Sequence, residues 1–360
     1  MRLRRLPDQA RALVAVSRAA AAAYDTSPLR AARRARTLRM RQHFEYREAL
    51  AEGLLDPAIP DEELRRHGSR HATVLEQRRL NSEAIAPLAG EKAVFYRYCE
   101  AVGIRTPRLL GVIDTSASGW SHTGLPVVGA EGFRRFVEED LPDSWVVKPS
   151  AGFHGAGVRV LERREGRLTE VSGRPTTPQA LFRELAADPR FPGWVVQERL
   201  ANHPDIAGLI DAPTLQTARL VTLVGRDGAP ELLYAVFRIA AAGGATDNFL
   251  QGATGNGLAS VRISDGVLES VKFAREGGLG FARGDALPGS GLPVAGVRLP
   301  HWEEAVSLVL RAAMAFLPAR SLGWDVALTP DGPVVVETNM FWWPRSGPEQ
   351  GPLLERLRNA

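Results

Sequence analysis

Residues 323–339 read GWDVALTPDGPVVVETN, two apolar segments that alternate like strands on either side of the turn at 330–332. This pattern predicts an antiparallel hairpin. Counted from the middle of the turn, Asp325 and Glu337 are equally distant, so we expect their Cβ atoms to lie opposite each other, about 4.5–5.5 Å apart. Asn339, two residues beyond Glu337, is expected to project from the same face.

Two carboxylates beside such apolar segments need compensation, because burying like charges costs several kcal/mol. The carboxylates of Asp325 and Glu337 and the amide oxygen of Asn339 form an oxygen-only ligand set, which suits magnesium. The hairpin therefore predicts a Mg²⁺ site, and the alternative is a solvated acidic face.

A second motif lies in residues 145–158, WVVKPSAGFHGAGV, where a strand pattern ends at Lys148 and leads into a glycine-rich loop. Backbone N–H groups of such a loop can approach phosphate oxygens, and the lysine adds charge. The lysine precedes the glycines and no helix follows, so the motif is neither a Walker loop nor a Rossmann fingerprint. His154 lies inside the loop and is either a substrate contact or ordinary polar surface. The loop glycines are Gly152, Gly155 and Gly157.

Lysine is scarce, since only Lys92, Lys148 and Lys272 stand among 45 basic residues. An ammonium group is a compact point charge that fits between phosphate oxygens, whereas guanidinium is a broad planar fork. We therefore expect that arginine could not replace these lysines.

The chain has 360 residues, 44% hydrophobic content and a net charge of +4, as expected of a folded protein. The single cysteine, Cys99, excludes an internal disulfide and favours a reducing, cytoplasmic setting. Charged residues interrupt the apolar start of the chain, and no segment has the about 20 apolar residues of a membrane span. We expect no membrane partner. The arginines of residues 30–41 lack aromatic platforms, which favours a solvated or partner-facing helix over nucleic-acid binding.

The organisation changes near residue 91. Residues 1–90 favour helices and predict an N-terminal helical lobe. Residues 91–198 alternate between strand and helix patterns, and residues 199–360 contain two hairpins and a helix. The sequence therefore predicts an α/β (α+β) protein with these three parts.

These motifs, in this order, resemble the ATP-grasp superfamily, and the closest match is its sugar-transfer-associated branch. The resemblance covers roughly residues 85–345. It implies two α/β subdomains that sandwich ATP, with Lys92 and Lys148 as phosphate lysines. Residues Gln197, Glu198, Arg199 and Leu200 resemble the linker over which adenine lies, and Asp205 resembles the acid that takes the ribose hydroxyls.

Arg238, followed by Asp247 and Asn248, is similar to a segment of amino-acid ligases in which the arginine neutralises the transferred phosphate. Many relatives carry an arginine two residues before the first magnesium acid, whereas this chain has Gly323. Arg219 or Arg238 would supply that charge here. Asp325, Glu337 and Asn339 resemble the magnesium triad of the family.

The resemblance implies a ligase that uses ATP and Mg²⁺ to convert a carboxylate to an acyl phosphate, which an amine or similar nucleophile then attacks. It implies small-molecule carboxylate and amine substrates, and Asp247 and His154 are candidate substrate contacts. After the metal ligands, residues 341–343 (Phe-Trp-Trp) are either an aromatic wall or core, with Arg345 as a clamp for a substrate carboxylate. The alternatives are a small-molecule kinase and a non-catalytic nucleotide-binding module. A homodimer is left open.

Overall fold

The computed structural model describes residues 5–114, 119–152, 155–210, 214–241, 247–249, 253–275, 279–288, 293–343 and 350–360. Its α-helices are α1 (Arg5–Ala23), α2 (Pro28–Gln42), α3 (Tyr46–Ala51), α4 (Asp61–Arg65), α5 (Arg70–Leu80), α6 (Ala86–Gly90), α7 (Lys92–Ala101), α8 (Gly129–Arg135), α9 (Pro178–Ala187), α10 (Pro204–Ala207), α11 (Trp302–Ala315) and α12 (Gln350–Asn359). A 3₁₀ turn, η1 (Glu83–Ile85), precedes α6, and a π-helical turn, η2 (Phe136–Asp140), continues α8.

The strands form two sheets whose neighbouring strands are all antiparallel. The first sheet has the order β2-β1-β7-β3-β4-β5-β6 and the second has the order β12-β11-β10-β9-β8-β13-β14. The strands of the first sheet are β1 (Leu109–Asp114), β2 (Trp120–Ser121), β3 (Ser144–Pro149), β4 (Arg159–Arg164), β5 (Arg167–Glu170), β6 (Pro175–Thr176) and β7 (Gly193–Glu198). Those of the second are β8 (Thr217–Val224), β9 (Pro230–Ile239), β10 (Gly257–Val261), β11 (Leu268–Ala274), β12 (Phe281–Gly284), β13 (Ser321–Thr329) and β14 (Gly332–Asn339).

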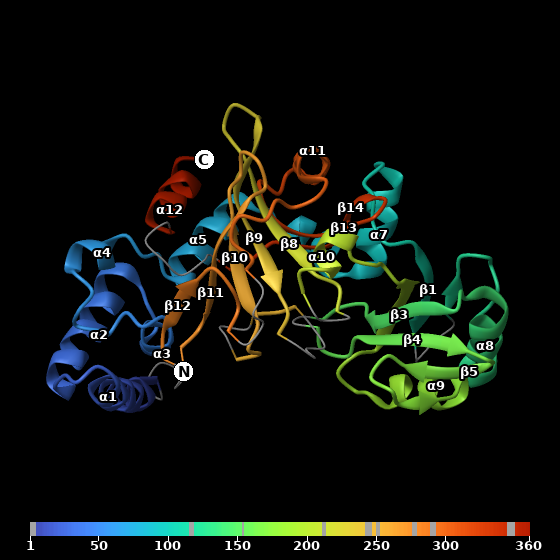
Figure 1. Cartoon of the computed structure of the whole chain (residues 1–360), viewed down its shortest axis with the longest axis horizontal. Coiled ribbons are helices and arrows are strands. Elements are labelled where there is room, and N and C mark those ends of the chain that lie inside the picture. Colours follow the sequence, from blue (N-terminus) through green and yellow to red (C-terminus); the bar gives the residue numbers. More distant parts are fainter. Residues whose placement is uncertain are drawn as a thin grey trace.

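The three regions of the chain lie in a row, with the helices α1–α4 at one end, the second sheet in the middle and the first sheet at the other end (Figure 1). The predicted boundary at residue 91 falls at the start of α7, and the boundary after residue 198 falls at the end of β7. The two sheets are therefore neighbours, and α7 lies beside the region between them (Figure 1).

Strand β13 lies in the interior of the second sheet, between β8 and β14, and each of its residues is buried. Helix α11 contacts β8, β9, β13 and β14. Its residues Ala305, Leu308, Val309 and Ala312 recur at helical spacing and are buried in the core that also contains Trp324. A strand covered on both faces is expected to be continuously apolar, which explains the character of WDVAL in this chain.

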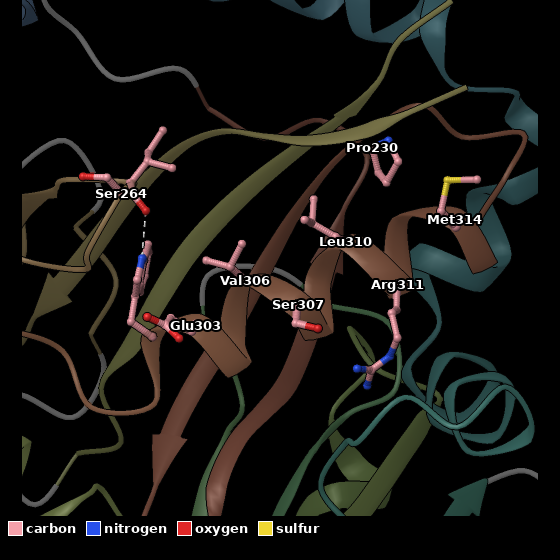
Figure 2. Close-up of a pocket in the computed structure, with 10 residues that line it drawn as sticks. Pro230, Ser264, Glu303, Val306, Ser307, Leu310, Arg311 and Met314 are labelled. Carbon is pink, nitrogen blue, oxygen red and sulfur yellow. Dashed lines mark hydrogen bonds between the residues drawn. The ribbon is translucent and has the colours of Figure 1, made fainter. Parts of the chain in front are cut away.

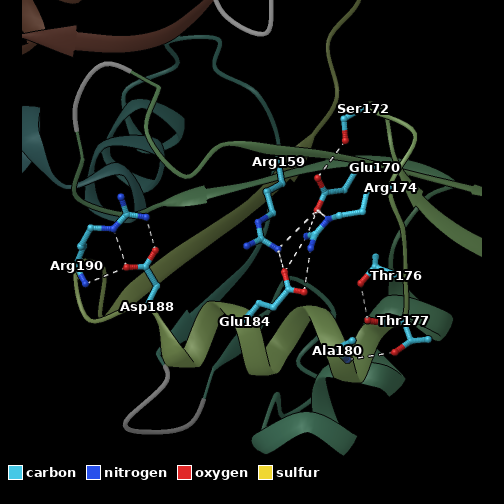
Figure 3. Close-up of polar contacts among 10 residues, drawn as sticks. All are labelled: Arg159, Glu170, Ser172, Arg174, Thr176, Thr177, Ala180, Glu184, Asp188 and Arg190. Atoms are coloured by element: carbon cyan, nitrogen blue, oxygen red, sulfur yellow. Dashed lines mark hydrogen bonds and ion pairs between the residues drawn. The ribbon is translucent and has the colours of Figure 1, made fainter.

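The first sheet is covered by α8 and α9, which bury a separate core around Phe133, Trp145 and Trp194. Thr177 caps α9 by accepting a hydrogen bond from the backbone N–H of Ala180, and Pro178 occupies the first turn. A network of ion pairs then connects α9 to β4, to β5 and to the residue before β6 (Figure 3). In this network Arg159 and Arg174 each pair with both Glu170 and Glu184.

The N-terminal helices have their own apolar core, which includes Ala31, Ala35, Leu38 and Phe44. They contact the second sheet at β11 and β12. The Nζ of Lys272, on β11, lies 3.7 Å from the Oε2 of Glu52, and both side chains are buried. The backbone N–H of Gly280 donates to the carbonyl of Ala51 at 3.1 Å. The helical region is therefore packed against the sheet rather than attached by a linker.

Candidate functional site

A cavity of about 460 Å³ opens between the two sheets, a volume typical of a small-molecule site. Residues of β3, β4 and β7 line one side, and residues of β8, β9, β13 and β14 line the other. Lys92, at the start of α7, also lines it. Residues from distant parts of the sequence therefore converge on one space.

The floor from the first sheet is largely apolar. Val146 pairs with Gln197 on one side and Val160 on the other, so these three residues form a row across β7, β3 and β4. All three line the cavity, and Leu200 joins them from the segment after β7. A flat apolar floor with an amide at its edge fits a planar ring with polar edge atoms.

Lys92 and Lys148 line the same cavity. The Nζ of Lys92 donates to the carbonyl of Gly152 at 3.2 Å and lies 4.0 Å from the Oε2 of Glu337. Lys148 is buried at the end of β3, with its Nζ 5.3 Å from the centre of the Tyr96 ring. Burial, and next the charge of Lys92, lower the pKa of Lys148 to about 7. Two cations are thus held in a space that favours an anion.

Helix α7 is fixed to the glycine-rich loop, and this contact places Lys92. The side chain of Glu91 caps the helix by accepting from the backbone N–H of Val94 at 2.7 Å. The N–H of Lys92 donates to the carbonyl of Ser150 at 2.8 Å. The start of the helix therefore lies against the segment that follows β3.

Of the loop glycines, Gly152 and Gly155 line the cavity, whereas Gly157 is not among the lining residues. Gly157 has a φ of +77°, and a Cβ there would lie 2.9 Å from the Cγ of Pro149. A side chain is thus excluded both by conformation and by space. His154 lies outside the described residues.

Asp325 and Glu337 are paired across β13 and β14, as the sequence predicted, but for a different reason. The hairpin turn is two residues long, since Thr329 pairs with Gly332, and that register continues to Val326 and Val335. A β-bulge then leaves Val336 as the extra residue and shifts Glu337 opposite Asp325. The predicted pair is present because the extra residue, Val336, compensates for a turn that is one residue shorter than the three residues expected.

Asp325 is already surrounded by arginine. Arg219, its partner on β8, donates from Nε to Oδ1 and from Nη2 to Oδ2, the latter at 2.9 Å. The Nη2 of Arg238 lies 3.1 Å from Oδ1. Burial alone would raise the pKa of Asp325, but the charges of Arg219 and Arg238 hold it well below its usual range.

Glu337 differs from Asp325 because its side chain is still 36% exposed. Its partial burial, and next the adjacent Asp325 carboxylate, raise its pKa. Asn339 pairs with Gly323, and its buried Nδ2 has no hydrogen-bond partner among the described residues. Asn339 is not among the residues that line the cavity.

Arg238 is held by a second acid. Its Nη1 lies 3.2 Å from the Oγ1 of Thr217 and 3.8 Å from the Oδ1 of Asp247. Asp247 is buried and accepts from both the N–H and the hydroxyl of Thr217, and burial raises its pKa. Asn248 follows it and lines the cavity. Arg219, which contacts Asp325, is not among the lining residues.

The predicted adenine linker is only partly at the cavity. Arg199 and Leu200 line it, with Arg199 also paired to Glu162. The Oε1 of Glu198 instead accepts from the backbone N–H of Arg108 at 2.8 Å, and Glu198 does not line the cavity. Asp205 also lies outside the lining, with its side chain 71% exposed beside His203.

The aromatic residues after β14 divide between core and surface. Trp342 is buried and donates to the hydroxyl of Ser321, whereas Phe341 and Trp343 are exposed. The guanidinium of Arg70 lies over the Trp343 ring at 4.2 Å. Arg345, the predicted clamp, lies outside the described residues.

The sequence interpretation missed Tyr96. It is fully buried on α7, and its hydroxyl lies 2.8 Å from the Oε1 of Gln197 and 3.0 Å from the carbonyl oxygen of Val336. Val336 is the bulged residue beside Glu337. The signal was available, since Tyr96 stands four residues after Lys92 and so shares its helix face.

The residues present fit an oxygen-coordinated dication, on the chemistry of their donors. Glu337 has an accessible carboxylate and Asp325 adds a second, whereas Asn339 lies outside the cavity lining, so its amide oxygen would join them only after the side chain turns. Within the described ranges no cluster of three or more His, Cys, Asp or Glu side chains is placed to hold a metal. A dication here would therefore need further oxygen ligands, as Mg²⁺ takes from phosphates and water.

A second cavity, of about 490 Å³, lies on the outer face of α11 (Figure 2). Val306, Leu310 and Met314 line it, with Glu303 and Arg311 as its charged residues. None of the predicted site residues that fall within the described ranges lies there. It lacks the clustered cations and acids of the cavity between the sheets.

Among the residues that the structure describes, no helix combines the length and apolar character needed to cross a membrane.

These observations define an α/β protein in which two antiparallel sheets enclose a cavity lined by cations and acids. The chain belongs to the sugar-transfer associated ATP-grasp family, whose model matches residues 73–359. Its fold is accordingly ATP-grasp-like, with helices before the two sheets, as the resemblance implied.

Several solved structures are similar. D-alanine–D-alanine ligase from Bacillus anthracis is 10% identical, with 77% of this chain and 69% of that chain covered and a TM-score of 0.43. Phosphoribosylamine–glycine ligase from Thermotoga maritima is 14% identical, with 72% and 49% covered and a TM-score of 0.41. Biotin carboxylase from Campylobacter jejuni, in a complex with an ATP analogue, is 10% identical, with 77% and 47% covered and a TM-score of 0.42. The chain spans about half the length of the last two. No curated protein matches it.

Proposed function

We propose that this protein is an ATP- and Mg²⁺-dependent ligase that activates a carboxylate as an acyl phosphate for attack by an amine or a similar nucleophile. The observation that carries the proposal is one cavity in which Lys92 and Lys148 face Arg238, Asp325 and Glu337. Such a space suits a triphosphate together with a dication. Synthesis of natural products or cell-surface polymers is the setting we propose.

The nucleotide would lie along the first sheet. Its base would rest on Val146 and Val160, with Gln197 and the backbone at residues 199–200 at its edge. Both the side chain and the backbone N–H of Glu198 are already bonded to the backbone of Arg108, so we assign the edge of the base to Gln197 and residues 199–200 instead. A ribose contact by Asp205 would require α10 to approach the cavity, because this acid lies outside the lining.

The triphosphate would lie where the two lysines meet the loop. Lys148 and Lys92 supply charge, and the loop at Gly152 and Gly155 brings the backbone close. Arg238 faces this space from β9, and we assign it the neutralisation of the phosphate that is transferred. Arg219 holds Asp325, so we propose that it orients this acid rather than touching substrate.

Glu337, Asp325 and Asn339 would hold magnesium. When bound, the metal neutralises phosphate charge and so helps the leaving group depart. Arg219 bonds both carboxylate oxygens of Asp325 and Arg238 adds a second contact to Oδ1, so we propose that Oδ1 becomes available to the metal as Arg238 turns toward phosphate. The chain's own part is to hold these groups in position before the reaction.

The reaction needs no covalent protein nucleophile. A substrate carboxylate oxygen attacks the γ-phosphorus, the bond to the β–γ bridging oxygen breaks, and ADP leaves with the electron pair. The amine then attacks the acyl carbon, inorganic phosphate departs and the amine loses a proton. Positioning and electrostatic stabilisation supply the rate, as is usual for phosphoryl transfer. Asp247 and Asn248, beside Arg238, are the described residues we assign to the substrate end, and His154 and Arg345 are proposed there from the sequence.

The test combines ATP, Mg²⁺ and pooled amino acids, amino sugars and small carboxylates, with hydroxylamine added in half of the assays. Hydroxylamine converts an acyl phosphate to a stable hydroxamate, so we expect ADP, phosphate and a hydroxamate. Release of AMP and pyrophosphate would overturn the proposal. Phosphate retained on a stable product would indicate a kinase, and ATP binding without turnover of any pool would indicate a non-catalytic module.

Glu337→Gln serves as the site variant. It removes the accessible carboxylate without changing the size of the side chain, so we expect the fold to persist and most turnover to be lost. Glu303→Gln, on the outer face of α11, is the matched control and should keep full activity. Equal activity of the two variants would refute the metal assignment.

A further inference from the structure

Helix α2 carries a charged outer face that the proposed function does not use. Its sequence, PLRAARRARTLRMRQ, contains six arginines and no acid. Ala31, Ala35 and Leu38 turn inward and are buried. Figure 1 places the helix at the end of the molecule farthest from the first sheet.

The exposed face has a regular composition. Leu29, Arg33, Arg36 and Met40 follow one another at spacings of four, three and four residues, which aligns them along one side of the helix. Leu29 is 75% exposed and Met40 is 81% exposed. Arg33 and Arg36 are thus flanked along the helix by two large apolar side chains, Leu29 and Met40, that are exposed to solvent.

Two of the helix's arginines are occupied within the fold. Arg34 donates to the carbonyls of Leu54 and Ile59, and Arg39 pairs with Glu45. The others, Arg30, Arg33, Arg36 and Arg41, are exposed and form no ion pair with any described residue. Their charge is therefore available to a partner.

We infer that this face of α2 docks on an anionic phospholipid membrane. Arginines bind lipid phosphates, and each cationic side chain near such a surface strengthens binding about fivefold. Leu29 and Met40 can enter the apolar boundary of the lipid, where their burial is favourable. This peripheral contact needs no spanning helix, so it revises the expectation of no membrane partner.

The apolar residues favour a membrane over a nucleic acid. Phosphate backbones attract arginine but offer no apolar layer for an exposed leucine and methionine. A surface for single-stranded nucleic acid would also carry aromatic side chains on which bases stack, and α2 contains none.

The test is sedimentation of the full chain with vesicles of phosphatidylcholine alone or with 30% phosphatidylglycerol. We expect binding only to the anionic vesicles, weakened by salt. Arg33→Glu/Arg36→Glu should lose at least about 25-fold in affinity, about fivefold for each arginine removed, and Leu29→Ser/Met40→Ser should also bind less tightly. The matched control is Arg164→Glu/Arg167→Glu, the same charge change at exposed residues of the first sheet, and it should bind like the unaltered chain.

A labelled variant gives an independent readout. Cys99 is buried, so Met40→Cys should accept a solvent-sensitive fluorophore at that residue alone. Its emission should shift to the blue with anionic vesicles, whereas the label on Arg164→Cys should not respond.

Absence of vesicle binding would overturn the inference, as would equal losses in the control. So would tighter binding to duplex DNA or RNA that depends on Arg33 and Arg36 but not on Leu29 and Met40. None of these readouts involves ATP, so the outcome is independent of the proposed reaction.

Discussion

Tyr96→Phe should separate the metal response of the site from nucleotide binding. The change removes one hydroxyl and leaves the ring beneath Lys148 in place. In the unaltered chain this hydroxyl lies within hydrogen-bonding distance of Gln197 and of the carbonyl of Val336. It therefore connects the base-binding strand with the bulge that sets the position of Glu337.

The magnitude follows from the bulge. Without the extra residue, the register from Thr329 to Val326 would continue and bring Val336 opposite Asp325. A slip of one residue turns each side chain to the other face of the sheet, so Glu337 would leave the site. Removing the Tyr96 hydroxyl takes a hydrogen-bond donor away from the carbonyl of Val336, and leaving such a buried group unsatisfied costs about 1–3 kcal/mol. The slipped register would then gain roughly 5- to 150-fold in population relative to the bulged one.

The assay is a thermal shift with a nonhydrolysable ATP analogue, titrated with Mg²⁺. We expect Tyr96→Phe to lower the melting temperature and to need about tenfold more Mg²⁺ for the same stabilisation. Stabilisation by the analogue alone should change less, because Val146, Val160 and the backbone at residues 199–200 keep their contacts and only Gln197 loses a partner.

Tyr98→Phe is the control. Its hydroxyl also donates to a backbone carbonyl, that of Ala315, but it does not line the cavity. It should lower the melting temperature by a similar amount and leave the Mg²⁺ titration unchanged. If Tyr96→Phe and Tyr98→Phe respond alike to Mg²⁺, the hydroxyl does not position Glu337.

Three further outcomes test the packing. Burial raises the pKa of the Cys99 thiol to about 12, so almost no thiolate exists at pH 8, and a thiol reagent should label the native chain far more slowly than the urea-unfolded one. Lys272→Arg should destabilise by about 1–3 kcal/mol, seen in the urea midpoint, because guanidinium is too broad for the buried space beside Glu52; an unchanged midpoint would contradict this. Gly323→Ala should lower stability by a similar amount, since the new Cβ would lie 2.7 Å from the Cβ of Trp342. This Cβ would also lie 3.2 Å from the Cδ of Arg219, which holds Asp325, so nucleotide binding should weaken as well.

Periodicity was enough to predict the elements with strong local signals. The strand pattern expected to end at Lys148 matches β3, which ends at Pro149, and the alternation expected over residues 91–198 includes α9 between β6 and β7. Each has a clear start, such as Thr177 before Pro178, or an apolar run bounded by turn residues. Local chemistry decides such elements, so a single sequence carries the information.

The strands of residues 257–284 were not predicted, although Asp265-Gly266 is a hairpin turn signal. Their alternation is weak because β10 is almost wholly buried and β11 carries a buried lysine, Lys272, beside Glu52 of the N-terminal region. A strand that is covered on two faces loses the polar half of its pattern. The ion pair that compensates for Lys272 joins residues far apart in the sequence, and spacing does not encode it.

Within the candidate site, the sequence grouped the charged residues but not the contacts between them. The family resemblance assigned Lys92 and Lys148 to one pocket as phosphate lysines, and both line the same cavity. Glu198 was assigned to the base, yet its carboxylate binds the N–H of Arg108, some ninety residues away. Which side chain a carboxylate meets depends on tertiary contacts that spacing does not encode.

The position of Arg219 explains the glycine that departs from the family pattern. Arg219 stands directly opposite Asp325 on β8, and its Cδ lies 3.2 Å from where a Cβ of residue 323 would be. Trp342 closes the same space from the other side, so residue 323 has room only for hydrogen. Arg219, on the neighbouring strand β8, thus reaches the Asp325 carboxylate. In the family pattern, an arginine two residues before this acid would reach it from the same strand. The two solutions exclude each other sterically, and this chain requires glycine at 323 because it places the charge on β8.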